Sequence, residues 1–514
     1  MGSTFNMRGD QMTPWMKLKA FLTIFGGLLI HLALGGQYTF GNVMPYLISY
    51  LKYRAGEPNV RNVDSLWFNT ATTPVQVVAF MLGGILYRRF GPRITTTIGA
   101  VIFSASTFLT YFAVQKSFIA LAFTQSVVGP FGTTIAYGGS LAVAMQWFPQ
   151  GSGLAGGIIL AGFGGSSSIL NQIITFYINP DNLSADVKEG SERYFSDVAL
   201  LNRVPSCYLI LGGIYTALQI FGVLLLFSPP SPDKNKLEAI VTYNKTSNRN
   251  FDENGKTENN DGEASVDDNT INKQETHTHI EMKQSDSTEE VEEGNPNSER
   301  ASSGGNTQED RTVLQLIKQM VMSRNFYIVS IVLFSVGYGN LTITTLYKVY
   351  GQTFILDDHF LALVGSLSSV FNCVGRPFWG AIMDRFRFKV AIQCITAGSA
   401  CLLMTILASE WVGKTLFVIW VCAVYFCVCG TYSTVPATLS KLYGVSNLGI
   451  TYGLARIATI ATAVISAVMG TTLRDVIGWH GVYLLGGGVT ALGFVASFFF
   501  IDEVSEQSKE NQET

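Results

Sequence analysis

The sequence has few charged residues for its length. Only 14% of its 514 residues are charged, whereas a soluble globular domain carries roughly 25% charged residues. A soluble chain of this length would fold into two or three domains, and each would need a charged surface. The composition therefore excludes an ordinary soluble multidomain enzyme, and a hydrophobic content of 48% excludes a wholly disordered chain.

Cysteine and enzyme motifs are scarce as well. All seven cysteines lie in or beside apolar runs, which is poor material for a disulfide framework, and their spacing matches no zinc site. The tripeptide Gly413-Lys414-Thr415 lacks the upstream glycine of a phosphate-binding loop. We therefore predict no enzyme, no catalytic residue, no metal, no cofactor and no nucleic-acid partner.

Long hydrophobic runs are abundant instead. A helix that crosses a bilayer needs about 20 apolar residues, and such runs occur six times before a long polar segment and six times after it. The predicted spans are 18–44, 66–87, 94–114, 118–145, 153–178, 205–228, 325–350, 360–383, 390–409, 414–440, 447–470 and 479–501. The sequence predicts an all-α membrane protein with twelve transmembrane helices in two six-helix bundles.

The polar segment between the two sets of spans differs sharply from the rest. Residues 231–310 hold 19 of the 37 acidic residues but only 8 of the 34 basic ones, so the apolar body is basic. Aromatic residues are almost absent there, and such a composition cannot bury enough apolar surface to fold. We predict a disordered acidic linker over 229–323. The other parts expected are a tail at 1–16, bundles at 17–228 and 324–501, and a tail at 502–514.

Basic residues in short loops predict the orientation. Lys17 and Lys19 precede the first span, and clusters at 88–93 and 385–389 fill the loops after spans 2 and 8. Lys and Arg concentrate on the cytoplasmic side of membrane proteins. Both termini and the linker are therefore expected in the cytoplasm, with the chain in a plasma or organellar membrane. A sequon at 182–184 falls on the opposite side, and it is a weak indication of glycosylation.

A short pattern repeats between the two halves. Residues 84–90 read GILYRRF, residues 380–386 read GAIMDRF, and every matched position is 296 residues apart. Arg93 pairs with Lys389 at the same offset. A parallel duplication of two six-helix units places a substrate site between them near the membrane midplane.

Two arginines within predicted spans are the most informative residues. Arg376 lies in span 8 and Arg456 in span 11, and no Asp or Glu lies deep in any predicted span. A charge at the bilayer centre costs about 2.5–3.5 kcal/mol on insertion scales, so it usually has a function. Cations without a counter-ion in the protein suit an anionic substrate, and a planar guanidinium matches a carboxylate. The alternative is that the arginines snorkel or bind backbone carbonyls.

Other polar residues lie on the inferred inner faces of the spans. Amide and phenol groups can orient a small carboxylate while their apolar parts exclude water. Those expected at the substrate site are Gln37, Tyr38, Gln76, Tyr137, Asn372 and Tyr432. For any single tyrosine, the alternative of an interfacial anchor or a core residue stays open. His31 in span 1 is expected to be a core histidine, and a proton relay is the less favoured interpretation.

Twelve spans, a long central linker and a G-x-x-x-D-R-F element after spans 2 and 8 resemble the major facilitator superfamily. The resemblance implies that this element closes the cytoplasmic side through charge contacts, with Arg89, Arg93, Asp384 and Arg385 as gating residues. The second copy is intact, whereas the first copy has Arg88 where the family has Asp.

Further segments resemble the oxalate/formate antiporter family and the monocarboxylate porters. They are GGQYTF at 35–40, WFP at 147–149, the stretch 372–380, and YGL at 452–454. The resemblance implies that Arg376, in its N-x-x-G-R element, binds the substrate carboxylate. Monocarboxylate porters carry Asp where this chain has Asn372, which weighs against their aspartate-linked proton coupling here.

The sequence thus predicts a secondary transporter for a small organic anion, working by alternating access. Its expected partners are the carboxylate, the bilayer, and a proton or a counter-anion, and its expected functional unit is a monomer. Two alternatives stay open: a facilitator of neutral amino acids or sugars on the same fold, and a non-transporting sensor whose acidic linker recruits partners.

Overall fold

The computed structural model describes residues 13–61, 64, 66–181, 183, 185–189, 192–230, 304–351, 353–355, 358–468 and 474–501. The chain separates into one compact unit of residues 1–229 with 314–514 and another of residues 230–313. Most of the predicted linker, and Asn182 and Ser184 of the sequon, lie outside the described residues. The first unit carries the predicted spans.

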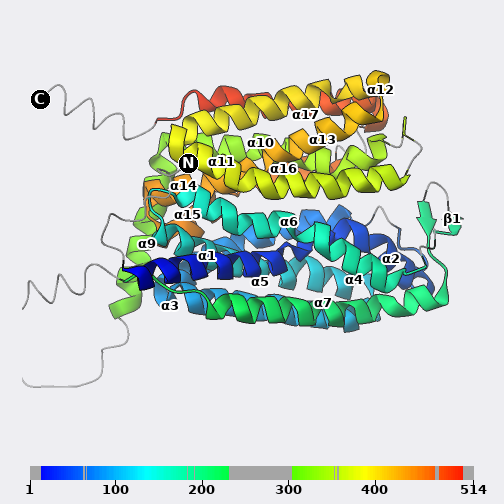
Figure 1. The fold of residues 1–514 in the computed structure, drawn as a ribbon, viewed down its shortest axis with the longest axis horizontal. Helices are drawn as coiled ribbons and strands as arrows, with labels where there is room; N and C mark the ends of the chain where they lie inside the picture. Colours follow the sequence, from blue (N-terminus) through cyan, green and yellow to red (C-terminus); the bar gives the residue numbers. More distant parts are fainter. Residues whose placement is uncertain are drawn as a thin grey trace, which may run out of the picture. The chain divides into compact units, whose positions relative to one another are not determined.

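The N-terminal half is built from helices that follow one another with short connections (Figure 1). Its elements are α1 (Pro14–Leu34), the 3-10 helix η1 (Gly35–Thr39), α2 (Phe40–Tyr53), α3 (Leu66–Val114), α4 (Phe118–Ala122), the π-helix η3 (Phe123–Val128), α5 (Gly129–Trp147), α6 (Ser152–Ile178) and α7 (Val198–Leu224). Between α6 and α7, β1 (Val187–Glu189) pairs antiparallel with β2 (Glu192–Tyr194).

The C-terminal half repeats this helical plan. Its elements are α9 (Gly304–Met322), α10 (Arg324–Gly351), α11 (Asp358–Thr405), η4 (Ile406–Ala408), α12 (Ser409–Val412), α13 (Lys414–Val428), α14 (Gly430–Tyr443), η5 (Val445–Asn447), α15 (Leu448–Ala455), α16 (Ala458–Val468) and α17 (Arg474–Ser497). The predicted all-α membrane architecture with two helical bundles is confirmed.

Two sharp bends reconcile the helix count with the twelve predicted spans. The described residues contain ten helices long and apolar enough to cross a membrane. Two of these, in α3 and α11, are each divided by a left-handed residue: Gly91 (φ 78°) and Arg387 (φ 71°). Each therefore supplies two spans. Gly91 and Arg387 are 296 residues apart, so the bends lie at matching places of the internal repeat.

The prediction of disorder over 229–323 is wrong for Gly304–Met322, which form α9. The apolar residues near its end recur with helical spacing, and Leu316 and Met320 are both buried. Side chains four residues apart lie on one face of a helix. The prediction failed because the average composition of residues 229–323 is acidic and polar, whereas the amphipathic stretch at its end is short.

Paired glycines bring the two halves into contact beside the bends. A Cβ atom on Gly153 of α6 would lie 2.6 Å from the carbonyl oxygen of Gly380 on α11. A Cβ atom on Gly84 of α3 would lie 2.5 Å from the backbone nitrogen of Ile450 on α15, which follows Gly449. The two pairs, Gly153 with Gly380 and Gly84 with Gly449, correspond in the internal repeat: Gly84 and Gly380 are 296 residues apart, and so are Gly153 and Gly449. Only glycine allows backbones to approach this closely.

Candidate functional site

Arg376 is buried where the two halves meet. The side chain lies on α11 and is 1% exposed. Its Nε donates to Asn372 Oδ1 (3.0 Å), and its Nη1 donates to the backbone carbonyl oxygen of Leu160 on α6 (3.1 Å). Its Nη2 donates to the hydroxyl of Tyr38 in η1 over a longer distance of 3.4 Å. All three acceptors are neutral, so none of them balances the charge.

Aromatic rings enclose the same guanidinium. Its Cζ lies 5.6 Å from the ring centre of Phe163 on α6 and 5.3 Å from that of Tyr432 on α14. Gly164 allows this approach, because a Cβ atom there would lie 2.5 Å from Asn372 Oδ1 and 3.1 Å from Arg376 Nε. Cation–π contacts stabilise a cation by about 0.5–2 kcal/mol each. They lower the penalty of burial without neutralising the charge.

Arg456 lies where span 11 is interrupted between α15 and α16. Its Nη2 donates to Gln76 Oε1 on α3 (3.1 Å), and its Cζ lies 5.4 Å from the ring centre of Phe80. Its Nε is buried and has no hydrogen-bond partner among the described residues. One donor of this second guanidinium is therefore available for a ligand.

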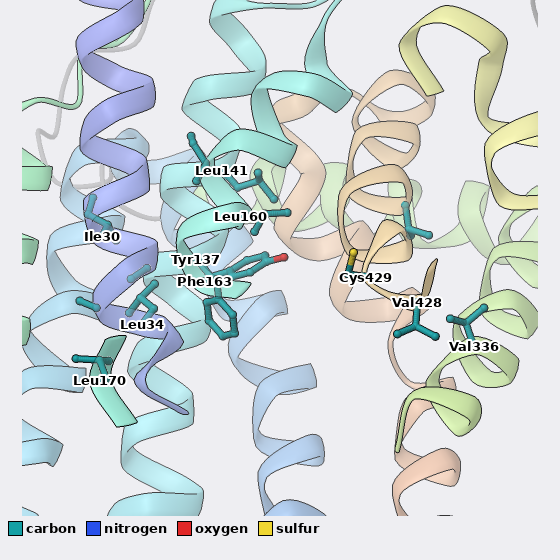
Figure 2. Packing of buried hydrophobic residues seen from close by; sticks show 14 of the residues in the cluster. Ile30, Leu34, Tyr137, Leu141, Leu160, Phe163, Leu170, Val336, Val428 and Cys429 are labelled. Atoms are coloured by element: carbon teal, nitrogen blue, oxygen red, sulfur yellow. The ribbon is translucent and has the colours of Figure 1, made fainter. Parts of the chain in front are cut away.

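The two arginines face one common group of phenols. The side chains of Tyr137, Tyr432 and Tyr452 each interact electrostatically with both Arg376 and Arg456. Figure 2 shows Tyr137 and Phe163 side by side between α1 and the C-terminal helices, with the phenol oxygen of Tyr137 toward those helices. Two positive charges therefore act on the same three phenols.

Amides support both arginines in matching ways. Gln76 and Asn372 are 296 residues apart, and each accepts a hydrogen bond from one arginine. The arginines themselves are not repeat partners, because Arg376 corresponds to Phe80 and Arg456 to Leu160. Within the described ranges, no carboxylate forms an ion pair or hydrogen bond with either arginine.

Most of the predicted site residues lie together, but Gln37 does not. Contacts or electrostatic interactions link Tyr38, Gln76, Tyr137, Asn372 and Tyr432 to the arginines. The side chain of Gln37 instead donates to Thr133 Oγ1 (3.3 Å). It lines a cavity of about 40 Å³ inside the N-terminal half.

Sequence reasoning missed several contributors to the centre. They are the carbonyl of Leu160, the ring of Phe163, and the amide of Asn340, which donates to the hydroxyl of Tyr432 (3.3 Å). The run of small residues along α6 does indicate a close helix contact, and Gly164 lies against Asn372 and Arg376. The backbone carbonyl of Leu160 has no signature in the sequence.

Asp384 joins the two halves beside the bends. Its carboxylate accepts from the backbone N–H groups of Gly153 (3.1 Å) and Leu154 (2.8 Å) in the first turn of α6. Lys441 Nζ lies 3.1 Å from the same carboxylate, whose side chain is 2% exposed. A carboxylate at a helix N-terminus satisfies free N–H groups and interacts favourably with the helix dipole.

The other predicted gating residues have different contacts. Arg93 Nη2 donates to the carbonyl of Leu224 (3.0 Å), which ties the bend to α7 within its own half. Arg89 and Arg385 are exposed and lie over the neighbouring rings of Phe90 and Phe386, each at 5.5 Å. Asp384 is therefore the member of this set that contacts the opposite half in the described structure.

Comparison with known proteins gives a consistent picture. The family model described as Major Facilitator Superfamily matches residues 26–424 and 329–514. "Apicoplast pyruvate carrier 1" of Toxoplasma gondii is 23% identical over 524 residues, which cover 93% of this chain and 88% of that protein. The "Oxalate:formate antiporter" of Oxalobacter formigenes is 24% identical over 194 residues, 37% of this chain and 46% of that protein.

Solved structures agree on the fold. The transporter FucP in its outward conformation aligns with a TM-score of 0.61 at 12% identity, covering 94% of this chain and 100% of that chain. The proton:xylose symporter XylE aligns with a TM-score of 0.60 at 14% identity, covering 94% of this chain and 96% of that chain. At these identities the likeness concerns the fold alone.

Proposed function

Because the chain belongs to the major facilitator superfamily, we propose that this transporter moves a small organic anion of the monocarboxylate or oxalate/formate type by alternating access. The observation that carries the proposal is Arg376: a buried guanidinium between the two halves whose hydrogen-bond acceptors are all neutral. The names of two relatives, a pyruvate carrier and an oxalate:formate antiporter, support the same substrate class.

The chemistry favours a carboxylate over a neutral solute. An uncompensated buried charge is strongly unfavourable, and an anion with well-placed oxygens removes that penalty. The bond from Arg376 to Tyr38 is the longest of its three, and Tyr38 is 44% exposed. A carboxylate that replaces this phenol at Nη2 gains a charge-assisted hydrogen bond, which is roughly twice as strong as a neutral one.

Arg456 offers the second contact. Its unpartnered Nε, and the phenols on which both arginines act, support a second set of donors for the anion. We assign to Arg456 a supporting role: it binds the far oxygen of a small anion, and Gln76 holds its guanidinium in place. Asn372 has the equivalent positioning role for Arg376.

Alternating access requires the two halves to separate at one end at a time. The end with the bends is held together by Asp384 and by the paired glycines. We propose that this end faces the cytoplasm, as the basic loops predict, and that the anion leaves through it once these contacts break. A monomer is sufficient for this cycle, because both halves belong to one chain.

The test is counterflow by the full chain reconstituted in liposomes. Labelled monocarboxylates, dicarboxylates, neutral amino acids and sugars are compared for wild type, Arg376→Gln and the matched control Arg324→Gln. Arg324 is exposed at the start of α10 and lies over the ring of Phe499. We expect carboxylate counterflow in wild type and in the control, and its loss in Arg376→Gln. Exchange of neutral solutes alone would overturn the proposal.

A deletion addresses the sensor alternative. Removing residues 240–310 takes away the acidic segment and leaves every described residue of the centre in place. Carboxylate counterflow at wild-type rates is expected from the shortened protein. A complete loss of transport in a protein that still reaches the membrane would contradict a mechanism based on the two bundles alone.

A further inference from the structure

His31 is a buried titratable group that the proposed function leaves unused. The residue lies on α1 and is 0% exposed. Its Nδ1 lies 2.9 Å from the carbonyl oxygen of Gly27, so Nδ1 carries the hydrogen and donates it. The lone pair of the neutral ring is then on Nε2, which is buried and has no partner among the described residues. A buried polar atom without a partner is costly to keep.

The surroundings of His31 are aromatic, with one nearby charge. From α5, the ring of Tyr137 packs edge-on at 5.0 Å, and from α6 the ring of Phe163 packs at 6.3 Å. From α11, the positive charge of Arg376 acts on the imidazole. Helix α7 packs against α1 through Gly222 and Ile30. Burial opposes a proton on His31 most strongly, and the charge of Arg376 adds to this opposition until an anion neutralises it.

Arg376 and His31 share Phe163 as a neighbour. The guanidinium lies 5.6 Å from that ring centre, and the imidazole ring centre lies 6.3 Å from it. An anion bound to Arg376 removes the repulsion that a proton on Nε2 would meet. Linkage is reciprocal, so a proton on His31 must strengthen anion binding by the same factor.

We propose that His31 is the proton-accepting residue that couples carboxylate movement to proton movement, with Nε2 as the site of protonation. This inference rests on the proposed function, because it requires an anion at Arg376. The carboxylate on Arg376 and the proton on His31 are bound during the same steps of the transport cycle. When the anion leaves, the positive charge of Arg376 again repels the proton, which then dissociates from Nε2. The result is proton–carboxylate symport with one proton per carboxylate.

The experiment uses the full chain in liposomes with a pH-sensitive dye inside. The variant is His31→Gln, which keeps a polar side chain but takes up no proton. The matched control is His480→Gln, at an exposed histidine that pairs with Glu410. In wild type and control, an inward proton gradient should accelerate carboxylate uptake, and carboxylate should carry protons inward.

The variant separates coupling from transport. His31→Gln should retain carboxylate counterflow, which needs no net proton movement. The proton flux per carboxylate should fall to the background leak of protein-free liposomes, because glutamine takes up no proton. An unchanged proton flux in His31→Gln overturns the inference. Wild-type counterflow without proton movement overturns it as well and leaves the proposed function standing, whereas no carboxylate counterflow in wild type refutes the proposed function itself.

A second measurement covers a variant that fails to fold. Carboxylate added to purified wild-type protein in weakly buffered solution should withdraw about one proton per bound anion. In protein labelled at histidine with carbon-13, one imidazole resonance should shift to its protonated position upon binding. Binding with no proton uptake, or with no shifted imidazole resonance, contradicts the inference.

Discussion

Replacing Asp384 by Asn should release the contact between the two halves beside the bends. The carboxylate accepts hydrogen bonds from the backbone N–H groups of Gly153 and Leu154 and forms an ion pair with Lys441. Hydrogen bonds to charged groups contribute about 1.5–3 kcal/mol each. An Asn amide still accepts one N–H group but presents its own NH₂ to the other. Lys441 lies on α14 in the same half as Asp384, so their ion pair persists when the halves separate and adds nothing to closure.

The expected loss is therefore about 2–3 kcal/mol for the arrangement in which α6 and α11 touch at this end. Since about 1.4 kcal/mol corresponds to a factor of ten, the ratio of closed to open molecules should fall roughly 30- to 150-fold. Spin labels at the exposed positions Phe90 and Phe386, in opposite halves, report this as a longer label-to-label distance.

The matched control for this experiment is Asp186→Asn. Asp186 comes after the C-terminal end of α6, whereas Gly153 lies at its N-terminal end, and the Asp186 carboxylate accepts hydrogen bonds from Ser196. The control should leave the distance between the labels unchanged. An identical distance distribution in Asp384→Asn and wild type would refute the reasoning, because the carboxylate would then contribute nothing to closure.

Two further predictions follow from single contacts. Arg376→Lys keeps the positive charge but loses the three guanidinium nitrogens that donate hydrogen bonds. Carboxylate affinity should therefore fall roughly 10- to 100-fold, at about 1.5–3 kcal/mol for a lost charge-assisted bond. The control Arg324→Lys should bind the carboxylate with wild-type affinity in the same equilibrium assay. Outside the membrane, the hydrogen bond from Lys52 lowers the pKa of Glu189. The hydrogen bond between Glu189 and Lys52, which holds β1 against α2, therefore contributes fully above the ordinary pKa of glutamate. Its contribution is lost as the pH falls through the lowered pKa of Glu189. Hydrogen exchange of residues 187–189 should rise at that pH, and Glu189→Gln should abolish the dependence; exchange that is flat with pH in wild type would contradict it.

Collective patterns made the fold predictable. Each span depends on about 20 side chains, so single residues hardly change the hydropathy signal. The offset of 296 residues, found in one short motif, also relates the bends at Gly91 and Arg387 and the glycine pairs. Helix α9 was missed because its short apolar stretch adjoins a long acidic segment.

The candidate site was predictable only where neighbouring residues or a single helix carry the signal. Arg376 and Asn372 are one turn apart on α11, so their pairing follows from helix geometry. Arg456 and Gln76 are 380 residues apart, and no local pattern predicts that they meet. Gln37 faces away because η1 is a 3-10 helix, and its tighter winding changes which side chains share a face.

The central claim is that the charge of Arg376 is neutralised by the carboxylate of the substrate. The most direct measurement is equilibrium binding to the purified full chain of one small monocarboxylate and of its uncharged amide, with wild type and Arg376→Gln. We expect the acid to bind wild type only and the amide to bind neither protein. Equal binding of the acid and the amide to wild type, or undiminished binding of the acid to Arg376→Gln, would contradict the account.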